Sequence, residues 1–259
     1  IFGNVMSTPT IKPTAEMSAE LQAAFDHFNE NLFGGDIPPT LLTLQRQKMT
    51  AGYFTAEGWV NRKGAQKIDE IALNPQYFAV QTLTESMKTL VLQMTFAWQK
   101  HFGQPGRRRY ANKNYAEKLQ SIGLMPSHTG KPGGRMTGEK IDAYVIEGGL
   151  FERACEKLLT ESFALSWLDR FPVTVQELSR VLHQLPEETR IGLTEDEVKK
   201  LDIKVVEKAE PASGQCRYHC PLCLKRVWGK KGMEGEFVHV PCGQVMVTGD
   251  IPDEEESDA

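Results

Sequence analysis

The chain has 259 residues, of which 40% are hydrophobic and 25% are charged, a composition typical of a globular protein with one large domain or two domains. No apolar run reaches the roughly 18 residues that a membrane-spanning helix needs. The N-terminus also lacks the basic and long apolar regions of a signal peptide, so we expect neither a membrane protein nor an exported one. The net charge of −4 conceals a basic stretch, since residues 99–140 hold nine Lys or Arg and two Glu, and an acidic tail at 250–259.

The first part of the chain predicts helices around a small sheet, after a flexible tail at residues 1–12. Apolar residues recur at helical spacing over 13–33, and Gly34-Gly35 is a typical helix end. Strands are expected over 41–44, 52–60 and 70–73, where leucines, aromatic residues and weak alternation favour extended structure. This order of elements indicates an α+β domain.

Residues 82–102 predict a long helix that organises this domain. Thr84 is expected to cap its start, and Gly103 with Pro105 ends it. Leu92 and Phe96 fall one turn apart, on the side opposite the main apolar stripe. That stripe consists of Leu83, Met87, Leu90, Val91, Met94 and Trp98. A surface helix would carry polar residues on its second side. The helix is therefore expected to be buried on both sides, or to line a cavity or a partner surface.

The following residues predict further helices and strands and then a folded connector. We expect a helix over 112–122, a glycine-rich loop over 128–137, a strand over 141–146 and a helix over 151–171. Residues 172–214 are expected to form a helical connector, with helical apolar spacing from Val175 to Leu185 and a capping box at Thr194-x-x-Glu197. A strand is expected over 203–206. Two helices and a turn also leave a helix-turn-helix reader as an alternative.

A resemblance is carried by the run TLVLQMTFAWQKHFGQPGRRRYANKNYAEKLQSIGLMPSHTGKPGGRMTGEKIDAYVIEGGLF. It resembles the core of the SprT-like (Spartan-like) zinc metallopeptidases, and more closely the versions carried on bacterial mobile elements. The resemblance covers roughly residues 13–171 and a C-terminal cysteine module. It implies a zincin-like α+β domain at 13–171, in which a small sheet packs on helices, and a zinc-ribbon-like β module at 215–249. The connector at 172–214 lies between them.

The same resemblance implies that the catalytic residues are missing. In that family a His-Glu-x-x-His helix supplies two zinc ligands and a general base. The matching positions here are Leu92, Gln93 and Phe96, while Ala111 stands for a later third histidine and Ala143 for a further one. Leu, Phe and Ala cannot bind zinc, and a glutamine amide cannot act as the base that a carboxylate provides. We therefore expect a catalytically inactive protein.

The C-terminal module predicts one structural zinc ion. Cys220-x-x-Cys223 has the spacing of a zinc knuckle, and His239-x-x-Cys242 supplies the two further ligands of a Cys3His site. Val245 stands where a ribbon would carry its fourth cysteine. Cys216 and His219 are alternative fourth ligands, and a ribbon that has lost its metal is the other interpretation. Five cysteines, four of them near the C-terminus, fit a metal site in the bacterial cytosol better than disulfides.

Two groups of basic residues predict contact with nucleic acid or with a nucleoprotein complex, and the resemblance favours DNA over RNA. They would neutralise phosphates without sequence preference, and one tryptophan would stack on single-stranded bases. The first group flanks the positions of the expected groove and comprises Arg107, Arg108, Arg109, Lys113, Lys131, Arg135 and Lys140. The second lies on the ribbon and comprises Lys225, Arg226, Trp228, Lys230 and Lys231. A solvated charged surface is the alternative for each single residue.

Together these observations favour an inactive SprT-like scaffold that binds nucleic acid or nucleoprotein, as part of an assembly linked to a mobile element, plasmid or phage. We expect no small-molecule cofactor and no membrane partner. One alternative is an active zinc peptidase with other ligands, for which His101 and His128 are candidates, or an engineered inactive form of one. Another alternative is a protein-interaction adaptor that does not bind nucleic acid; its partner binding would not depend on salt.

Overall fold

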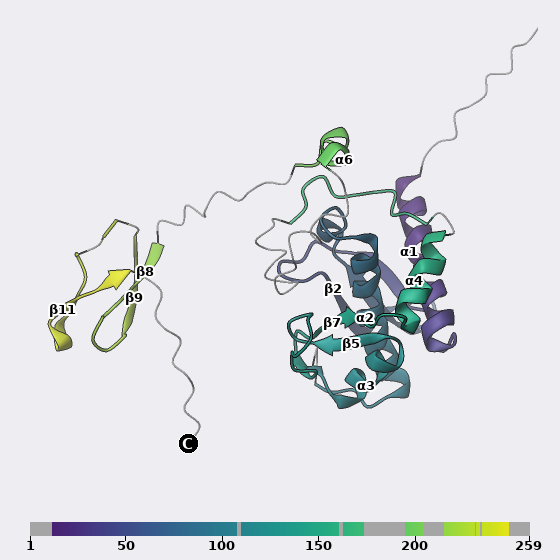
Figure 1. Cartoon of the computed structure of the whole chain (residues 1–259), viewed down its shortest axis with the longest axis horizontal. Helices are drawn as coiled ribbons and strands as arrows, with labels where there is room; N and C mark the ends of the chain where they lie inside the picture. The colour runs from purple at the N-terminus through teal and green to yellow at the C-terminus, as the bar shows by residue number, and fades with distance from the viewer. Residues whose placement is uncertain are drawn as a thin grey trace, which may run out of the picture. The chain divides into compact units, whose positions relative to one another are not determined.

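The computed structural model describes residues 12–107, 110–160, 163–173, 195–204, 215–230, 232–233 and 235–248. The chain divides into two compact units, Ile1–Val206 and Glu207–Ala259. Its architecture is mixed α+β with several small sheets, in agreement with the predicted class (Figure 1). The expected tails at 1–12 and 250–259 lie outside the described residues, apart from Lys12. Within the described part, no helix combines the length and apolarity needed to cross a membrane.

The first unit contains the long helices and a three-stranded sheet. Its helices are α1 (Pro13–Phe33), η1 (Pro75–Tyr77), α2 (Leu83–Phe102), α3 (Lys113–Ser121), α4 (Leu150–Thr160) and α6 (Glu195–Lys200). Its strands are β1 (Leu41–Leu44), β2 (Gly52–Val60), β3 (Lys67–Leu73), β4 (Tyr110–Ala111), β5 (Leu124–Ser127), β6 (Gly138–Glu139) and β7 (Asp142–Val145). The sheet order is β1-β3-β2, with β3 parallel to β1 and antiparallel to β2. The predicted strand over 70–73 is thus the inner end of a longer β3.

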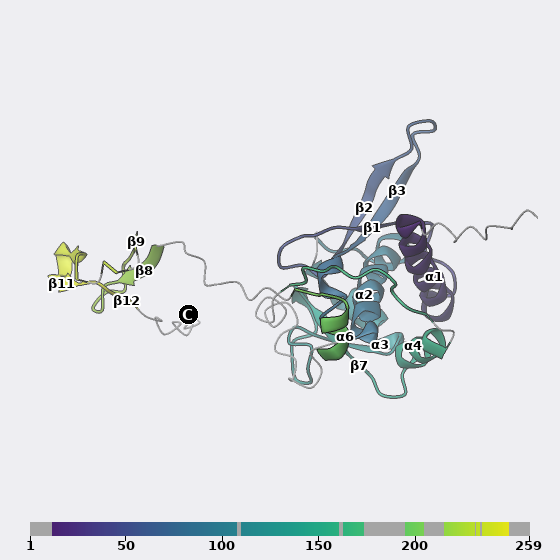
Figure 2. The same ribbon diagram turned by 90° about the horizontal axis from the view of Figure 1, so that it is seen from above.

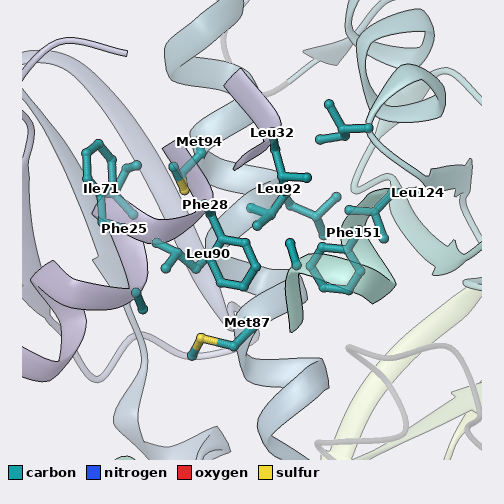
Figure 3. Close-up of a cluster of buried hydrophobic side chains, with 14 of the residues drawn as sticks. Phe25, Phe28, Leu32, Ile71, Met87, Leu90, Leu92, Met94, Leu124 and Phe151 are labelled. Atoms are coloured by element: carbon teal, nitrogen blue, oxygen red, sulfur yellow. The ribbon is translucent and has the colours of Figure 1, made fainter. Parts of the chain in front are cut away.

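Helix α2 is buried on both sides, as its two apolar faces predict. Met87, Leu90 and Met94 are fully buried in the core shared with α1 and β3. Leu92, on the opposite side, is only 7% exposed and belongs to the same cluster (Figure 3). The predicted cap was wrong by two residues. The Thr82 hydroxyl accepts a hydrogen bond from the Glu85 backbone N–H, because a cap oxygen reaches the N–H three residues on.

Helix α3 and the pair β5–β7 complete this core. The Asn112 side chain caps α3 by accepting from the Tyr115 backbone N–H at 3.1 Å, as a helix over 112–122 implies. The strand expected over 141–146 is β7, and its antiparallel partner β5 was not predicted. Gly123 joins α3 to β5 with a φ of +89°, and a Cβ there would lie 2.6 Å from the Leu150 backbone nitrogen. The turn therefore requires glycine.

The helix expected over 151–171 is shorter, because α4 ends at Thr160. Its buried stripe is formed by Phe151, Ala154, Cys155 and Leu158. Residues 163–171 are not helical. Phe163, Leu165 and Leu168 still pack against the core. Phe163 and Leu165 are two residues apart, which is the spacing that places side chains on the same side of an extended segment.

Much of the predicted connector lies outside the described residues, including 174–194 and 205–214. Helix α6 starts just after Thr194, where the capping box predicts a helix, although Thr194 itself is not described. The strand expected over 203–206 was wrong for its described part, since Ile203 and Lys204 are in no strand. The Lys204 N–H donates to the carbonyl of Arg170, itself outside any strand, so no ladder forms.

The second unit is a small β module. Its elements are β8 (Gln215–His219), β9 (Arg226–Lys230), β10 (Val238–His239), η3 (Val240–Cys242), β11 (Gln244–Val245) and β12 (Val247–Thr248). They form a three-stranded sheet of order β12-β8-β9 and the hairpin β10–β11. Its buried core consists of Tyr218, Cys220 and Met246. A core of this size is too small to stabilise a domain without another cross-link.

Candidate metal centre and basic surfaces

The first half of the candidate metal centre is the turn that joins β8 to β9. The Cys220 N–H donates to the carbonyl of Lys225, and the Leu224 N–H donates to the carbonyl of Cys220, both at 2.9 Å. Leu224 takes a positive φ of +57°, which closes the turn. These bonds bring Cys220 and Cys223 to the same side of the turn. The sequence spacing Cys-x-x-Cys therefore folds as the knuckle that it predicts.

The second half comes from the turn between β10 and β11. His239 is the last residue of β10, and the 3₁₀ turn that follows ends at Cys242. Gly243 then takes a φ of +63°, which allows the chain to return as β11. His239 Nδ1 lies 3.4 Å from the Cys223 Sγ of the other turn. The two turns thus face each other across the module.

The four side chains form a cluster that could hold a metal ion. One ligand atom each from Cys220, Cys223, His239 and Cys242 lies within 4.8 Å of all the others. In a tetrahedral zinc site with Zn–S bonds of about 2.3 Å, neighbouring sulfurs are about 3.8 Å apart. A small contraction would therefore close the cluster around a cation. Within the described ranges no other group of three or more such ligands comes this close together.

Hydrogen bonding shifts the pKa values of two thiols of the cluster, Cys220 and Cys242, in opposite directions. Desolvation opposes ionisation of Cys220, but hydrogen bonds from the backbone N–H groups of Cys223 and Leu222 outweigh it, so its pKa is lowered. Hydrogen bonding to Cys223, followed by desolvation, raises the pKa of the Cys242 thiol to about 11. Adjacent thiols share protons in this way, and a bound cation would displace those protons. The arrangement suits a metal that binds thiolates.

The alternative fourth ligands, Cys216 and His219, are not part of the described cluster. His219 is 9% exposed and is not a member of the cluster, and its Nδ1 has no hydrogen-bond partner among the described residues. The Cys216 side chain lies outside the described part of the chain. Val245, in the place of a missing cysteine, is 47% exposed on β11. His239 is thus the residue that completes the set of four.

The positions of the expected catalytic motif are filled by packed side chains. Phe96 stacks on Tyr115, with ring centroids 4.2 Å apart, and Leu92 and Ala111 are buried. Gln93 lies between Leu92 and Met94 on α2 and is half-buried. None of Leu92, Phe96 and Ala111 carries an atom that can bind a metal. His101 and His128, the candidate substitutes, instead bond elsewhere, His101 to Asp69 at 2.7 Å and His128 to the Arg135 backbone N–H at 2.9 Å.

A buried lysine lies one turn before Leu92 and was not predicted. The Lys88 ammonium lies 2.7 Å from Glu85, 3.3 Å from Asp142 and 2.9 Å from the carbonyl of Ala143, to which it donates. Desolvation works against its charge, but attraction to Asp142 and Glu85 outweighs it, so the pKa of Lys88 is raised. The charged group thus links α2 to β7. The spacing of apolar residues along α2 gives no sign that a buried charged residue lies at Lys88.

The first group of basic residues gathers around the pair β4–β6. Arg107 precedes β4 and pairs with Glu139 of β6 at 3.2 Å, and Arg135 approaches Gly138 of the same strand. Lys140 directly follows β6, whereas Lys113 is the first residue of α3 and lies 3.7 Å from Glu117. Lys131 lies on the loop after β5, and its carbonyl accepts from the Ser127 hydroxyl. All five side chains are exposed, whereas Arg108 and Arg109 lie outside the described residues.

The second group forms one face of the sheet β12-β8-β9. Arg226, Trp228 and Lys230 alternate along β9 and are all exposed, Trp228 by 66%. Arg217 of β8 is directly opposite Trp228 and is also exposed. Paired residues in an antiparallel sheet share a face. We call Arg217, Arg226, Trp228 and Lys230 the ribbon face.

Arg217 was not among the predicted residues, because only the register of β8 with β9 places it opposite Trp228. The other face of this sheet packs Tyr218 and Val227 against Phe237 in the small core. Lys225 is exposed in the turn before β9, and Lys231 is not described. The ribbon face therefore joins three cations and an aromatic ring on one side of a short sheet.

Comparison with known proteins identifies one informative relative. No family model matches the chain, and no solved structure matches it significantly. A protein of Salmonella typhimurium described as "Uncharacterized protein in mucB 3'region" is 49% identical over 59 residues, which are 23% of this chain and 80% of that protein. Identity and coverage of this size indicate common descent. The chain therefore belongs to the same family as this Salmonella typhimurium protein.

Proposed function

We propose that this chain is a catalytically inactive SprT-like protein of the bacterial cytosol that binds nucleic acid, with a zinc ion stabilising its C-terminal module. The observation that carries the proposal is the ribbon face. Three cations surround one tryptophan that is two-thirds exposed. Exposure of a tryptophan ring to water costs free energy. When a base stacks on the ring, that surface is covered, and the adjacent cations can contact the phosphates. The ribbon face has the composition of a platform for single strands.

Zinc is the cation that the donor set favours. Three thiolates and one imidazole in a closed cluster are typical of structural zinc. Cys220, Cys223, His239 and Cys242 would hold the ion, which would fix the two turns of a module with a small core. In this proposal the metal orders β9 and so positions Trp228.

The packing around α2 supports an inactive protein. Leu92 and Ala111 are buried and Phe96 is stacked on Tyr115. Once a family member loses its metal, apolar side chains are more stable in such a site than unpaired imidazoles. The SprT-like domain would then serve as a scaffold, and the cations around β4–β6 would add contacts to phosphates. A complex of protein and DNA, linked to a mobile element, is the partner that this combination suits.

The test measures binding of the full-length, zinc-loaded chain to a fluorescent single-stranded 20-nucleotide DNA by anisotropy. Trp228→Ala is expected to weaken binding about tenfold, since stacking on one base contributes about 1–3 kcal/mol. Arg217→Ala and Arg226→Ala should each weaken it and each reduce the salt dependence by about one charge. Leu222→Ala is the matched control, because Leu222 is equally exposed, at 70%, but lies in the turn of the knuckle.

Two results would contradict the proposal. One is a wild-type chain that binds neither single-stranded nor duplex DNA at low salt. The other is binding that does not change with salt and survives Trp228→Ala, which would favour the adaptor alternative. RNA of the same sequence, used in place of DNA, measures the expected preference for DNA.

A further inference from the structure

The outer half of the hairpin formed by β2 and β3 is a second exposed element of the first unit. Every residue from position 56 to 67 is exposed, and we call this segment the wing. Figure 2 shows β2 and β3 extending together away from α1 and α2. β1 pairs only with the inner end of β3, at residues 70–73, so it gives the wing no neighbouring strand. The wing is therefore a two-stranded ribbon on its own.

The wing is held in a fixed shape despite its exposure. At its tip the Asn61 N–H donates to the carbonyl of Gln66 at 2.7 Å, and the Asn61 side chain accepts from the Lys63 N–H at 2.9 Å. At its base a bulge occurs between Thr55 and Trp59. Because the wing already has a defined shape, it loses little conformational entropy when it binds a partner.

The base of the wing is anchored through Asp69. One carboxylate oxygen accepts from the Glu57 N–H in the bulge, and the other lies 2.7 Å from His101 Nε2. Asp69 is 4% exposed, so this bond joins the wing to the end of α2 in a partly buried site. The wing thus projects from a fixed point, which is how a recognition element is usually supported.

The chemistry of the wing matches a polyanion. The wing contains the three cations Arg62, Lys63 and Lys67 and one acidic residue, Glu57. Lys67 forms an ion pair with Glu57 at 3.3 Å, but both side chains are more than half exposed, so the pair exchanges for a phosphate at little cost. Trp59 and Val60 are 47% and 63% exposed and can contact base edges or sugars.

We propose that the wing is a second nucleic-acid contact and that its partner is duplex DNA. The inference rests on the proposed function and extends it to a separate surface. A two-stranded β ribbon fits the major groove of B-DNA, which is about 12 Å wide. Arg62 and Lys63 at the tip would contact phosphates, and Trp59 would face the groove. In this proposal the ribbon face binds single strands and the wing binds a duplex.

The experiment compares Arg62→Ala/Lys63→Ala with the wild type, using full-length zinc-loaded protein and fluorescent DNA as a 20-base-pair duplex or a 20-nucleotide single strand. The variant should bind the duplex about tenfold more weakly, with a salt slope lower by about two, and should keep its affinity for the single strand. The control Lys199→Ala/Lys200→Ala removes two exposed charges from α6 in the same unit and should change neither affinity.

The outcomes separate the two proposals. Unchanged duplex affinity in Arg62→Ala/Lys63→Ala, with single-strand binding intact, would overturn the wing proposal alone and leave the open strand edges as a site for a protein strand. A wild type that binds neither DNA would overturn the proposed function and the wing with it. An equal loss in the α6 control would show a general charge effect and would also overturn the wing proposal.

Discussion

The Tyr115 hydroxyl donates a hydrogen bond to the backbone carbonyl of Leu92 across 3.1 Å. The ring of the same tyrosine stacks on Phe96, one turn further along α2. Burial keeps the phenol protonated, because it raises the pKa of Tyr115 far above its usual value. One side chain of α3 therefore closes the place where the SprT resemblance expects a metal.

Tyr115→Phe tests this contact. It keeps the ring stacking and removes the hydroxyl, so the free energy of unfolding should fall by about 1 kcal/mol. Tyr115→Ala also removes the ring and should lower it by about 3–5 kcal/mol. Urea denaturation followed by circular dichroism measures both. Equal stability of Tyr115→Phe and the wild type would mean that the hydroxyl contributes nothing.

Lys88→Met tests the buried charge cluster. The substitution keeps most of the side-chain length but leaves the carboxylates of Glu85 and Asp142 without their cation, so unfolding should become easier by about 3–5 kcal/mol. Lys113→Met is the matched control, since Lys113 is 87% exposed beside Glu117. It should change stability by less than about 1 kcal/mol. Similar losses in the two variants would argue against a special role for Lys88.

Cys155 is predicted to be unreactive in the folded chain. Burial, aided by Glu152 and Glu156, raises the pKa of its thiol to about 12. An unfolded cysteine ionises near pH 8.5. The folded thiol keeps its proton where the unfolded one loses it, so stability is unaffected below about pH 8.5 and falls as the pH rises toward 12. Cys155→Ala should remove that part of the decrease.

Alkylation provides the direct measurement for Cys155. Iodoacetamide at pH 8.5 followed by peptide mapping should leave Cys155 unmodified in native protein and modify it in urea. Rapid modification in the native state would show that the α4 side chain opens to solvent.

Gly229→Ala tests the packing of the C-terminal module. A Cβ at this position would lie 2.4 Å from a ring atom of Phe237, so β9 or the ring must move. Overpacking of this kind costs about 1–3 kcal/mol. Because folding and metal binding are coupled in such modules, zinc affinity should fall by about tenfold in competition with a chelator. The control Leu222→Ala, at an exposed site, should keep the wild-type affinity.

Sequence patterns predicted the elements that local physics specifies. The periodicity of α2 indicated two buried faces, and Asn112 and Gly34 mark helix ends through capping and positive φ. The spacing of Cys220, Cys223, His239 and Cys242 suggested one cluster, which the fold brings together. In each case the information lies within one continuous segment of the sequence.

The parts that escaped prediction depend on distant contacts. The Lys88 cluster requires β7 to place Asp142 beside α2, and no local pattern specifies that pairing. The end of α4 at Thr160 was missed because Phe163 and Leu165 continue an apolar run while changing its period from helical to extended. Arg217 joins the ribbon face only through the register of β8 with β9.

Zinc stoichiometry of the purified chain, compared with that of Cys220→Ser/Cys223→Ser, decides whether the protein holds a single structural metal ion in its C-terminal cluster. An inactive scaffold with a structural metal predicts one zinc per chain in the wild type and none in the double variant. A zinc ion that remains in the double variant, or a second one in the wild type, would contradict the account. Such a result would place a metal ion outside the C-terminal cluster and would favour the alternative of an active zinc peptidase.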